Sequence, residues 1–308
     1  MSASREADSA GHRLASGGPA PRVHGDRRGW TRGVLGLALV LPPLLVLAFL
    51  VILPAISAVV TTLTPAADAV PAAPLANYAE VLGTRILRTG IVFTVIVTLV
   101  AVAAVFCLSY PLALYLRFVR TRMAALLGVL FMVPLFVPVV IASFAMITFL
   151  VGHGLVSTVL YHLGIERFPR LVYNATGIVL TEVWVSIPFA VLILGAGLQA
   201  IDDALIDSAR DVGAGPLRTF LAIILPLNAA PTMITLTLLF IAIFGSFTIP
   251  YLVGGNAPQM LGVTMTSYLT QYLRRTESAT LAVIAFMIAS VVGVVYVASV
   301  SRRERAAP

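Results

Sequence analysis

The ten residues IDSARDVGAG, Ile206–Gly215, are a short polar stretch between long apolar runs. Asp202 or Asp203 can cap the start of a helix at this point, because a carboxylate accepts hydrogen bonds from the first free N–H groups. Gly213 can take the left-handed conformation that ends the helix, and Pro216 suits the first turn of the next one. We therefore predict two helices joined by a turn.

The whole segment, residues 201–227, is called the link below, and its periodicity predicts distinct faces for each helix. Residues three or four positions apart lie on one face of a helix. The first helix then has an apolar stripe of Leu205, Ala209 and Val212 and an acidic stripe of Asp203, Asp207 and Asp211, and the second has an apolar stripe of Leu217, Phe220, Leu221 and Ile224. Arg210 can pair with Asp207. The pattern fits both a plain connector and a docking element for a cytoplasmic partner.

The composition places the chain among integral membrane proteins. Of its 308 residues, 59% are hydrophobic and only 11% are charged, whereas soluble domains have about 25% charged residues. The basic residues are all Arg and cluster at the ends of apolar runs, which indicates topology signals and no nucleic-acid partner. A phosphate-binding P-loop needs a Lys, and the sequence has none. If ATP drives the function, another subunit must bind it.

Six apolar runs are each long enough to cross a bilayer, which requires about 20 residues. They are Val34–Val60, Thr89–Leu116, Met123–Leu150, Ala175–Ala200, Asn228–Thr248 and Ala279–Val300. We expect an all-α, polytopic membrane protein with six transmembrane helices. An even number of helices places both termini on the same side.

The distribution of Arg predicts which side this is. With cytoplasmic termini, the inner segments hold 14 Arg and the outer segments hold six, as the positive-inside rule requires. This orientation puts the link in the cytoplasm. We expect a disordered cytoplasmic tail at 1–30, a first transmembrane helix with an outer connection at 31–76, a core at 77–300 that contains the link, and a cytoplasmic C-terminus at 301–308. Residues 151–174 are expected outside with a short surface helix, and residues 249–278 are expected to be rich in turns.

No pattern in the sequence predicts a metal site, a cofactor or a disulfide. The single cysteine, Cys107, lies within an apolar run and is typical of a small buried side chain. The four histidines have no metal-ligand spacing: His12, His24, His153 and His162.

The link resembles the "EAA" loop of binding-protein-dependent ABC transporter permeases, which has the form E-A-A-x-x-x-G-x₉-I-x-L-P. This chain has Asp207-Ser208-Ala209, then Gly213, then nine residues and Ile223-Ile224-Leu225-Pro226. The spacing matches throughout, with Asp in place of Glu and Ser in place of Ala. The resemblance covers residues 77–300, with NYAEVL, SYPLALYLRF, VSIPFAVLILGAGLQAID and FGSFTIPYLVGG as further matching segments. It is strongest to the spermidine/putrescine group, with iron(III) and phosphonate importers as relatives.

This resemblance implies a type I importer (MetI-like) permease fold in the bacterial inner membrane, surrounded by lipid. It also implies a second, different permease subunit, ABC ATP-binding subunits and a periplasmic or lipid-anchored solute-binding protein. The chain itself would be no enzyme, because the partner subunits hydrolyse ATP. The link would contain the coupling helix that docks into the ATPase, and its coupling residues would be Asp207, Ser208, Ala209, Arg210, Gly213 and Pro226.

Glu182 is the only ionisable residue inside a predicted span, and a carboxylate there usually faces a cavity or a partner. It either lines the pathway for a cationic solute or pairs with Arg85, Arg88 or a neighbouring subunit. Outside the membrane, Gly254 and Gly255 fit both a plain turn and a contact with the binding protein. Trp184 and Tyr251 are interpreted as membrane-interface anchors.

Two other classes of function compete with the ABC permease. An ion-coupled secondary transporter would have several charges within its spans or matched discontinuous helices. The single Glu182 and the lack of a repeat disfavour that class. An intramembrane enzyme would need a catalytic set, and no Ser/Lys dyad, zinc signature or paired Asp appears within the spans.

Overall fold

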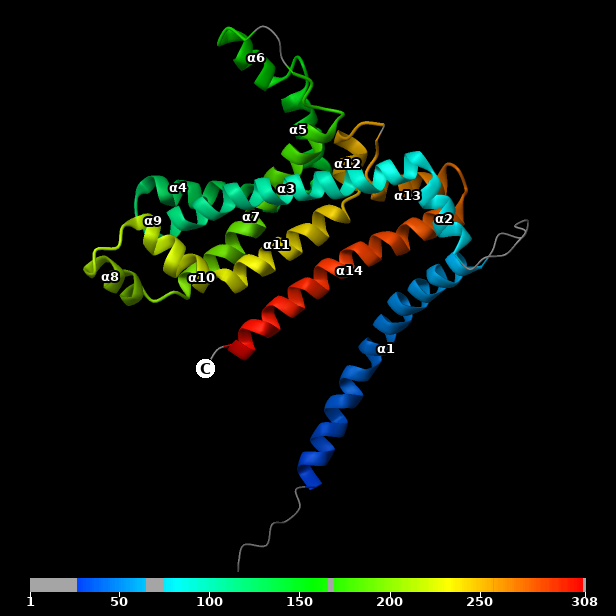
Figure 1. Ribbon diagram of the computed structural model, residues 1–308, viewed down its shortest axis with the longest axis horizontal. Coiled ribbons are helices and arrows are strands. Elements are labelled where there is room, and N and C mark those ends of the chain that lie inside the picture. The colour runs from blue at the N-terminus through cyan, green and yellow to red at the C-terminus, as the bar shows by residue number, and fades with distance from the viewer. Residues whose placement is uncertain (1–26, 65–74, 166–168, 257, 307–308) are drawn as a thin grey trace, which may run out of the picture. The chain divides into compact units, whose positions relative to one another are not determined.

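The computed structural model describes residues 27–64, 75–165, 169–256 and 258–306, and all regular structure in these ranges is helical (Figure 1). The prediction of an all-α chain is confirmed. Most of the expected tail, residues 1–26, and the stretch 65–74 of the first outer connection lie outside the described residues. The first helix begins at Arg27, earlier than expected, and the last helix includes residues 301–306.

Two compact units, Met1–Ala55 and Ile56–Pro308, are described separately. The described part of the first unit belongs to α1 (Arg27–Leu63), which contains three prolines. Membrane helices tolerate internal prolines better than soluble ones because neighbouring groups satisfy the freed carbonyls. The apolar side chains along this helix are exposed within the chain, as expected of a surface that faces lipid or another subunit.

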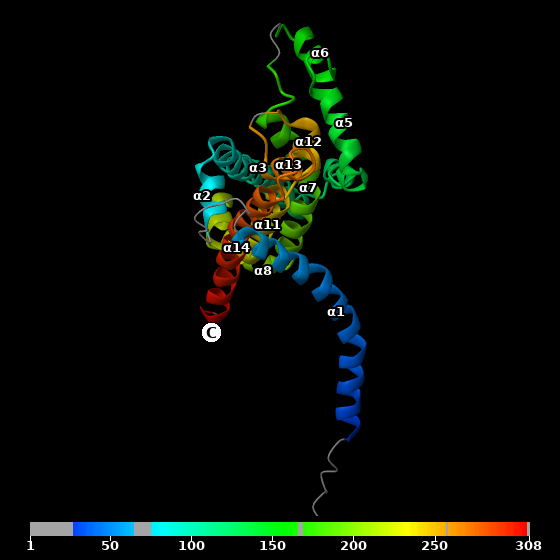
Figure 2. The same ribbon diagram turned by 90° about the vertical axis from the view of Figure 1, so that its right-hand side faces the viewer.

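The second unit is built around α3 (Arg85–Phe118) and α7 (Ala175–Gln199), which pack along their lengths. Val97 of α3 shares a core cluster with Ile178 near the start of α7, and Tyr110 near the end of α3 shares another with Leu194 near the end of α7, so the two helices run parallel. In Figure 2, α7 and α11 (Ala229–Phe244) lie beside α3, and α14 (Arg275–Ala306) lies beside α11. The short α2 (Ala76–Gly83) contacts α3 and α14.

Five helical segments are long and apolar enough to cross a membrane, and a sixth is obtained if one bent pair forms a single span. The five are Gly36–Leu63, Arg85–Phe118, Val139–His162, Ala175–Gln199 and Arg275–Ala298, and the bent pair is Pro216–Leu227 with Ala229–Phe244. The prediction of six spans therefore holds for the described residues when the bent pair counts as one.

The third span differs from its prediction, Met123–Leu150. The structure divides this stretch into α4 (Arg122–Leu130), a 3₁₀ turn η1 (Val133–Phe136) and α5 (Val139–Leu150). The reason is Pro138, because a proline disfavours helical backbone in the residue before it, and Val137 is extended with ψ 117°. The candidate span starts only at α5 and continues through the expected surface helix, α6 (Leu155–His162).

The fifth span is also interrupted. It was predicted as Asn228–Thr248, but α11 ends at Phe244 and a separate short helix, α12 (Thr248–Val253), follows. A further helix, α13 (Leu261–Thr270), occupies part of the region expected to be rich in turns. At its other end, α11 meets the second half of the link at a bend of 69°.

Candidate functional site

The first helix of the link, α8 (Asp203–Asp211), is capped at both ends by its own sequence. The Ala204 N–H donates to Asp202 Oδ1 at 3.0 Å, which assigns the N-cap to Asp202. At the other end Gly213 has φ +78°, and the Ala214 N–H donates to the Ala209 carbonyl at 2.9 Å. Both predicted caps are therefore present, and the geometry at Gly213 is the left-handed helix end that favours glycine.

The predicted apolar stripe of this helix is wrong in two of its three members. Leu205 and Val212 are exposed, and the side chains that face the core are Ile206 and Ala209. Val212 lies in the turn that follows the helix, so the helical periodicity does not apply to it. Ile206 packs into the core cluster of the second halves of α3 and α7.

The second half of the link forms one helical stretch with three local geometries: α9 (Pro216–Thr219), a π-helical turn η2 (Phe220–Ile224) and α10 (Leu225–Leu227). Of its predicted apolar stripe, Ile224 is buried and Phe220 is half-buried. The remaining two members, Leu217 and Leu221, are exposed. Together with Leu205 and Val212 they give the link an apolar surface that the chain itself does not cover.

Two charged side chains of the link, Asp207 and Arg210, are exposed and pair with each other. Arg210 donates to Asp207 Oδ1 at 3.1 Å, and both side chains are 65% exposed. Ser208 donates to the Ala204 carbonyl one turn earlier. Pro226 lies exposed in α10. The structure thus places the predicted coupling residues on the two helices of the link, with Asp207 and Arg210 available to a partner.

Arg117, at the end of α3, was not among the predicted site residues. It forms an ion pair with Asp203 and donates to the carbonyls of Leu198 at 3.2 Å and Ile201 at 3.3 Å. Its side chain is only 16% exposed. This one guanidinium fastens the start of the link to the ends of both α3 and α7. An Arg directly after an apolar run was the only signal for it in the sequence.

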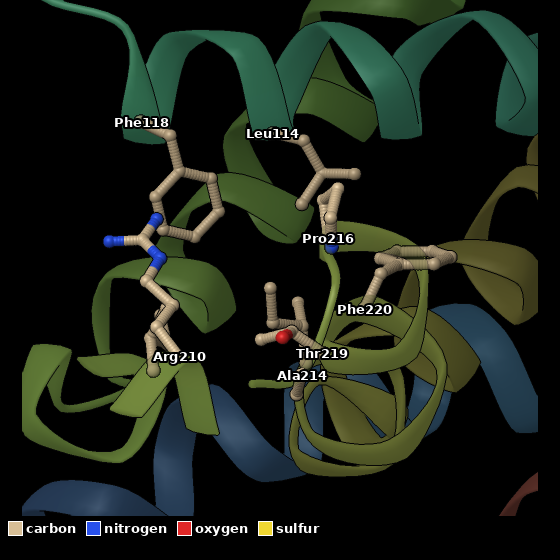
Figure 3. A pocket seen from close by; sticks show the side chains of 9 residues that line it. Leu114, Phe118, Arg210, Ala214, Pro216, Thr219 and Phe220 are labelled. Atoms are coloured by element: carbon tan, nitrogen blue, oxygen red, sulfur yellow. The ribbon is translucent and has the colours of Figure 1, made fainter. Parts of the chain in front are cut away.

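A cavity of about 340 Å³ lies between the end of α3 and the two halves of the link. Figure 3 shows Leu114 and Phe118 of α3 on one side of it, and Pro216 and Phe220 of the link nearby. The Arg210 side chain extends toward Phe118 in the same view. The cavity is therefore apolar with one cationic group at its edge.

Asn228 marks the bend between the link and α11, and it is completely buried. Its Nδ2 donates to Tyr110 Oη at 3.3 Å, while its Oδ1 has no partner among the described residues. Gly197 of α7 makes this position possible, because a Cβ there would overlap Asn228 Oδ1 and the ring of Pro231. This contact was not predicted, although an Asn at the start of an apolar run was a visible signal in the sequence.

Glu182 is 4% exposed within α7. Among the described residues it forms no ion pair with Arg85 or Arg88, so the predicted intrachain pairing is absent. Ser246, at the break between α11 and α12, lies next to the carboxyl group, and Glu182 Oε1 has no partner among the described residues. The carboxyl group thus lies where three helices meet and keeps one oxygen available.

The predicted glycine turn outside the spans is tightly packed. A Cβ at Gly254 would meet the Pro250 carbonyl, and one at Gly255 would meet the Tyr173 carbonyl. These contacts give both glycines a packing role. Trp184 is half-buried, and Tyr251 is exposed and stacks on Phe247.

Residues 106–306 match the model of one protein family, described as the binding-protein-dependent transport system inner membrane component. The chain belongs to this family. The matched residues contain both helices of the link, so the resemblance of the link to the EAA loop is confirmed at the level of the family.

The chain is similar to PotB, the spermidine/putrescine transport system permease protein of Escherichia coli, with 29% identity over 165 residues; these cover 53% of this chain and 60% of PotB. It is 30% identical over 150 residues to ModB, the molybdenum transport system permease protein of Azotobacter vinelandii, covering 48% of this chain and 65% of ModB. The chain thus matches less than two thirds of either relative.

Among solved structures, the chain is similar to one from a bacterial alginate ABC transporter in complex with an alginate-bound periplasmic protein. The TM-score is 0.74, with 17% identity and coverage of 87% of this chain and 94% of that one. This likeness establishes the fold, which is that of an ABC importer permease, as predicted.

Proposed function

We propose that this chain is a permease subunit of an ATP-driven importer, and that it forms part of the solute pathway and couples it to a separate ATPase. The observation that carries the proposal is the capped helix α8, which has the EAA spacing and presents Asp207 and Arg210 to solvent. The exposed Leu205 and Val212 beside them add apolar surface that a docked partner would cover.

The proposed partners are ATP-binding subunits on the side of the link, a second permease subunit of different sequence and a solute-binding protein on the opposite side. The absence of Lys supports a separate ATPase, because the chain cannot supply the P-loop lysine. In this proposal the link and both termini lie in the cytoplasm, as the distribution of Arg favours.

We propose a polyamine-like solute, with iron(III) and phosphonates as the other classes. The similarity to PotB supports the first class, and a cation would also suit a pathway lined by Glu182. The side chain is buried between spans and has one oxygen without a partner among the described residues, which is typical of functional carboxylates in membranes.

Co-purification in mild detergent, followed by reconstitution in lipid vesicles, tests the proposal. We expect the ATPase, the second permease and the binding protein to be recovered with this chain, and uptake to require ATP and the separate ATPase. The binding protein can then be screened against polyamines, iron(III) and phosphonates by thermal shift. Uptake driven by an ion gradient alone would instead support a secondary transporter.

A further inference from the structure

A second pocket, of about 530 Å³, lies at the end of the helical unit opposite the link. Its walls include Arg85 at the start of α3 and Tyr268 of α13. The other end of α3 carries Arg117, which is tied to the link. Since α3 has 34 residues and a helix rises 1.5 Å per residue, about 50 Å separates the two ends. If the link lies in the cytoplasm, this pocket faces outward.

Several hydrogen-bond donors line the pocket, and none of its described lining residues is acidic. The donors that matter here are Arg85, Thr89, Gln259, Ser267, Tyr268 and Tyr272. Arg85 has no acidic partner among the described residues, as is also true of the exposed Arg88, Arg120 and Arg218, but only Arg85 of these lines the pocket. An unneutralised guanidinium among neutral donors favours an anionic ligand, and the planar fork of Arg suits a carboxylate.

Two further features of the pocket point to the same ligand. Ser267 is only 8% exposed, and its hydroxyl makes no hydrogen bond to a described residue, so a buried polar group is left for a ligand to satisfy. The start of α3 has no side-chain cap. Its free N–H groups and the helix dipole add partial positive charge beside Arg85.

We propose that this pocket binds an acidic side chain, Asp or Glu, of the solute-binding protein. This inference rests on the proposed function, in which that protein docks on the side opposite the ATPase. The rim fits a protein partner, because Ile86 is 77% exposed and Tyr272 63% exposed beside Arg85. Exposed aromatic and Arg side chains of this kind are enriched in protein interfaces. A cationic solute would be repelled by the pocket.

The test compares Arg85→Ala with Arg88→Ala. Both arginines are exposed on the first turn of α3, but Arg88 does not line the pocket. We measure the affinity of the purified binding protein for the permease–ATPase complex in lipid nanodiscs at low and high salt. We expect Arg85→Ala to weaken binding about tenfold at low salt and to reduce its salt dependence, as for a desolvated interfacial charge. Arg88→Ala should leave both unchanged.

Tyr272→Phe and Ser267→Ala extend the test, because each removes one hydroxyl from the pocket and keeps the size of the side chain similar. We expect smaller losses of affinity, in the same direction as Arg85→Ala. Equal affinities for Arg85→Ala, Arg88→Ala and the unchanged chain would overturn the proposal. So would competition by millimolar acetate that abolishes uptake without displacing the binding protein, since the pocket would then bind a free anion.

The failure of this inference can be distinguished from the failure of the proposed function. If the unchanged complex takes up solute with ATP and a binding protein, the proposed function stands. The comparison of Arg85→Ala with Arg88→Ala then tests only the proposed role of the pocket. If solute uptake by the unchanged complex does not require a binding protein, both the proposed function and the proposed role of the pocket are wrong.

Discussion

The polar groups of the link and those buried between the spans are arranged in opposite ways. In the link, Asp207 and Arg210 are mostly exposed and pair with each other. Between the spans, four buried side chains each have one polar atom without a partner among the described residues: Thr98, Ser109, Glu182 and Asn228. The charged pair of the link therefore lies where water could replace it, and the unpaired atoms lie buried among the packed spans of this chain.

This difference distinguishes side chains that can serve to dock a partner from side chains that affect the packing of the spans. An exposed ion pair adds only about 0–1 kcal/mol to stability, so the charges of the link are free to be set by what a partner needs. A buried polar atom without a partner costs about 1–3 kcal/mol, so Glu182 and Asn228 persist only if something else compensates. Four sets of variants test this difference between the exposed and the buried polar groups.

Gly197→Ala should have the largest effect. The added Cβ would overlap Asn228 and the ring of Pro231, and overpacking of this kind costs about 1–3 kcal/mol or more. We expect a lower thermal midpoint and a large loss of monodisperse protein in size-exclusion chromatography. Gly195→Ala is the matched control on the same helix, because no atom lies within 4 Å of its added Cβ. Equal behaviour of the two variants would contradict the close packing.

Gly213→Val should have the second largest effect, and its only cause should be the backbone conformation of this residue. Gly213 has φ +78° and nothing within 4 Å of an added Cβ, so the cost is the left-handed conformation, about 1–2 kcal/mol and more for a β-branched residue. We expect loss of the ATPase subunit, or ATP hydrolysis without uptake. Gly213→Asn should keep most of the coupling, because Asn tolerates this conformation. Normal recovery of the complex with normal uptake by the Val variant would refute the prediction.

Glu182→Gln should lower uptake severalfold and leave the amount of complex unchanged. The substitution preserves the shape of the side chain, removes the charge and replaces one acceptor oxygen by an amide donor. The measurement is the initial rate of uptake with the same binding protein and ATPase. Glu80→Gln, at an exposed site, is the control. Full uptake with unchanged selectivity in Glu182→Gln would remove the pathway role.

Asp207→Ala should have the smallest effect on stability, below about 1 kcal/mol, because its ion pair is exposed. Arg117→Ala should cost more, about 1–3 kcal/mol, since it leaves carbonyl groups without a donor. Thermal unfolding of each variant is the measurement, with ATPase retention recorded beside it. We expect Asp207→Ala to lose more ATPase than its stability change explains. Equal destabilisation by the two variants would contradict the assignment of Asp207 to docking and of Arg117 to packing.

Local sequence rules predicted much of the link and failed where long-range packing decides. The caps at Asp202 and Gly213 were predictable because each hydrogen bond joins residues at most five positions apart. The stripe through Val212 failed because the helix ended one residue earlier. Pro138 was a sequence signal for the break before Val139. It was not sufficient, because prolines are common inside membrane helices and α1 contains three without a break.

The sequence was therefore sufficient for the membrane class, the caps of α8 and the spacing that marks the family. These follow from hydrophobicity and from hydrogen bonds between near neighbours in the chain. Only the tertiary structure decided that Arg117 meets Asp203, 86 residues away, and that Asn228 meets Tyr110, 118 residues away. Such pairs depend on how α3, α7 and α11 pack, and no local propensity specifies that packing.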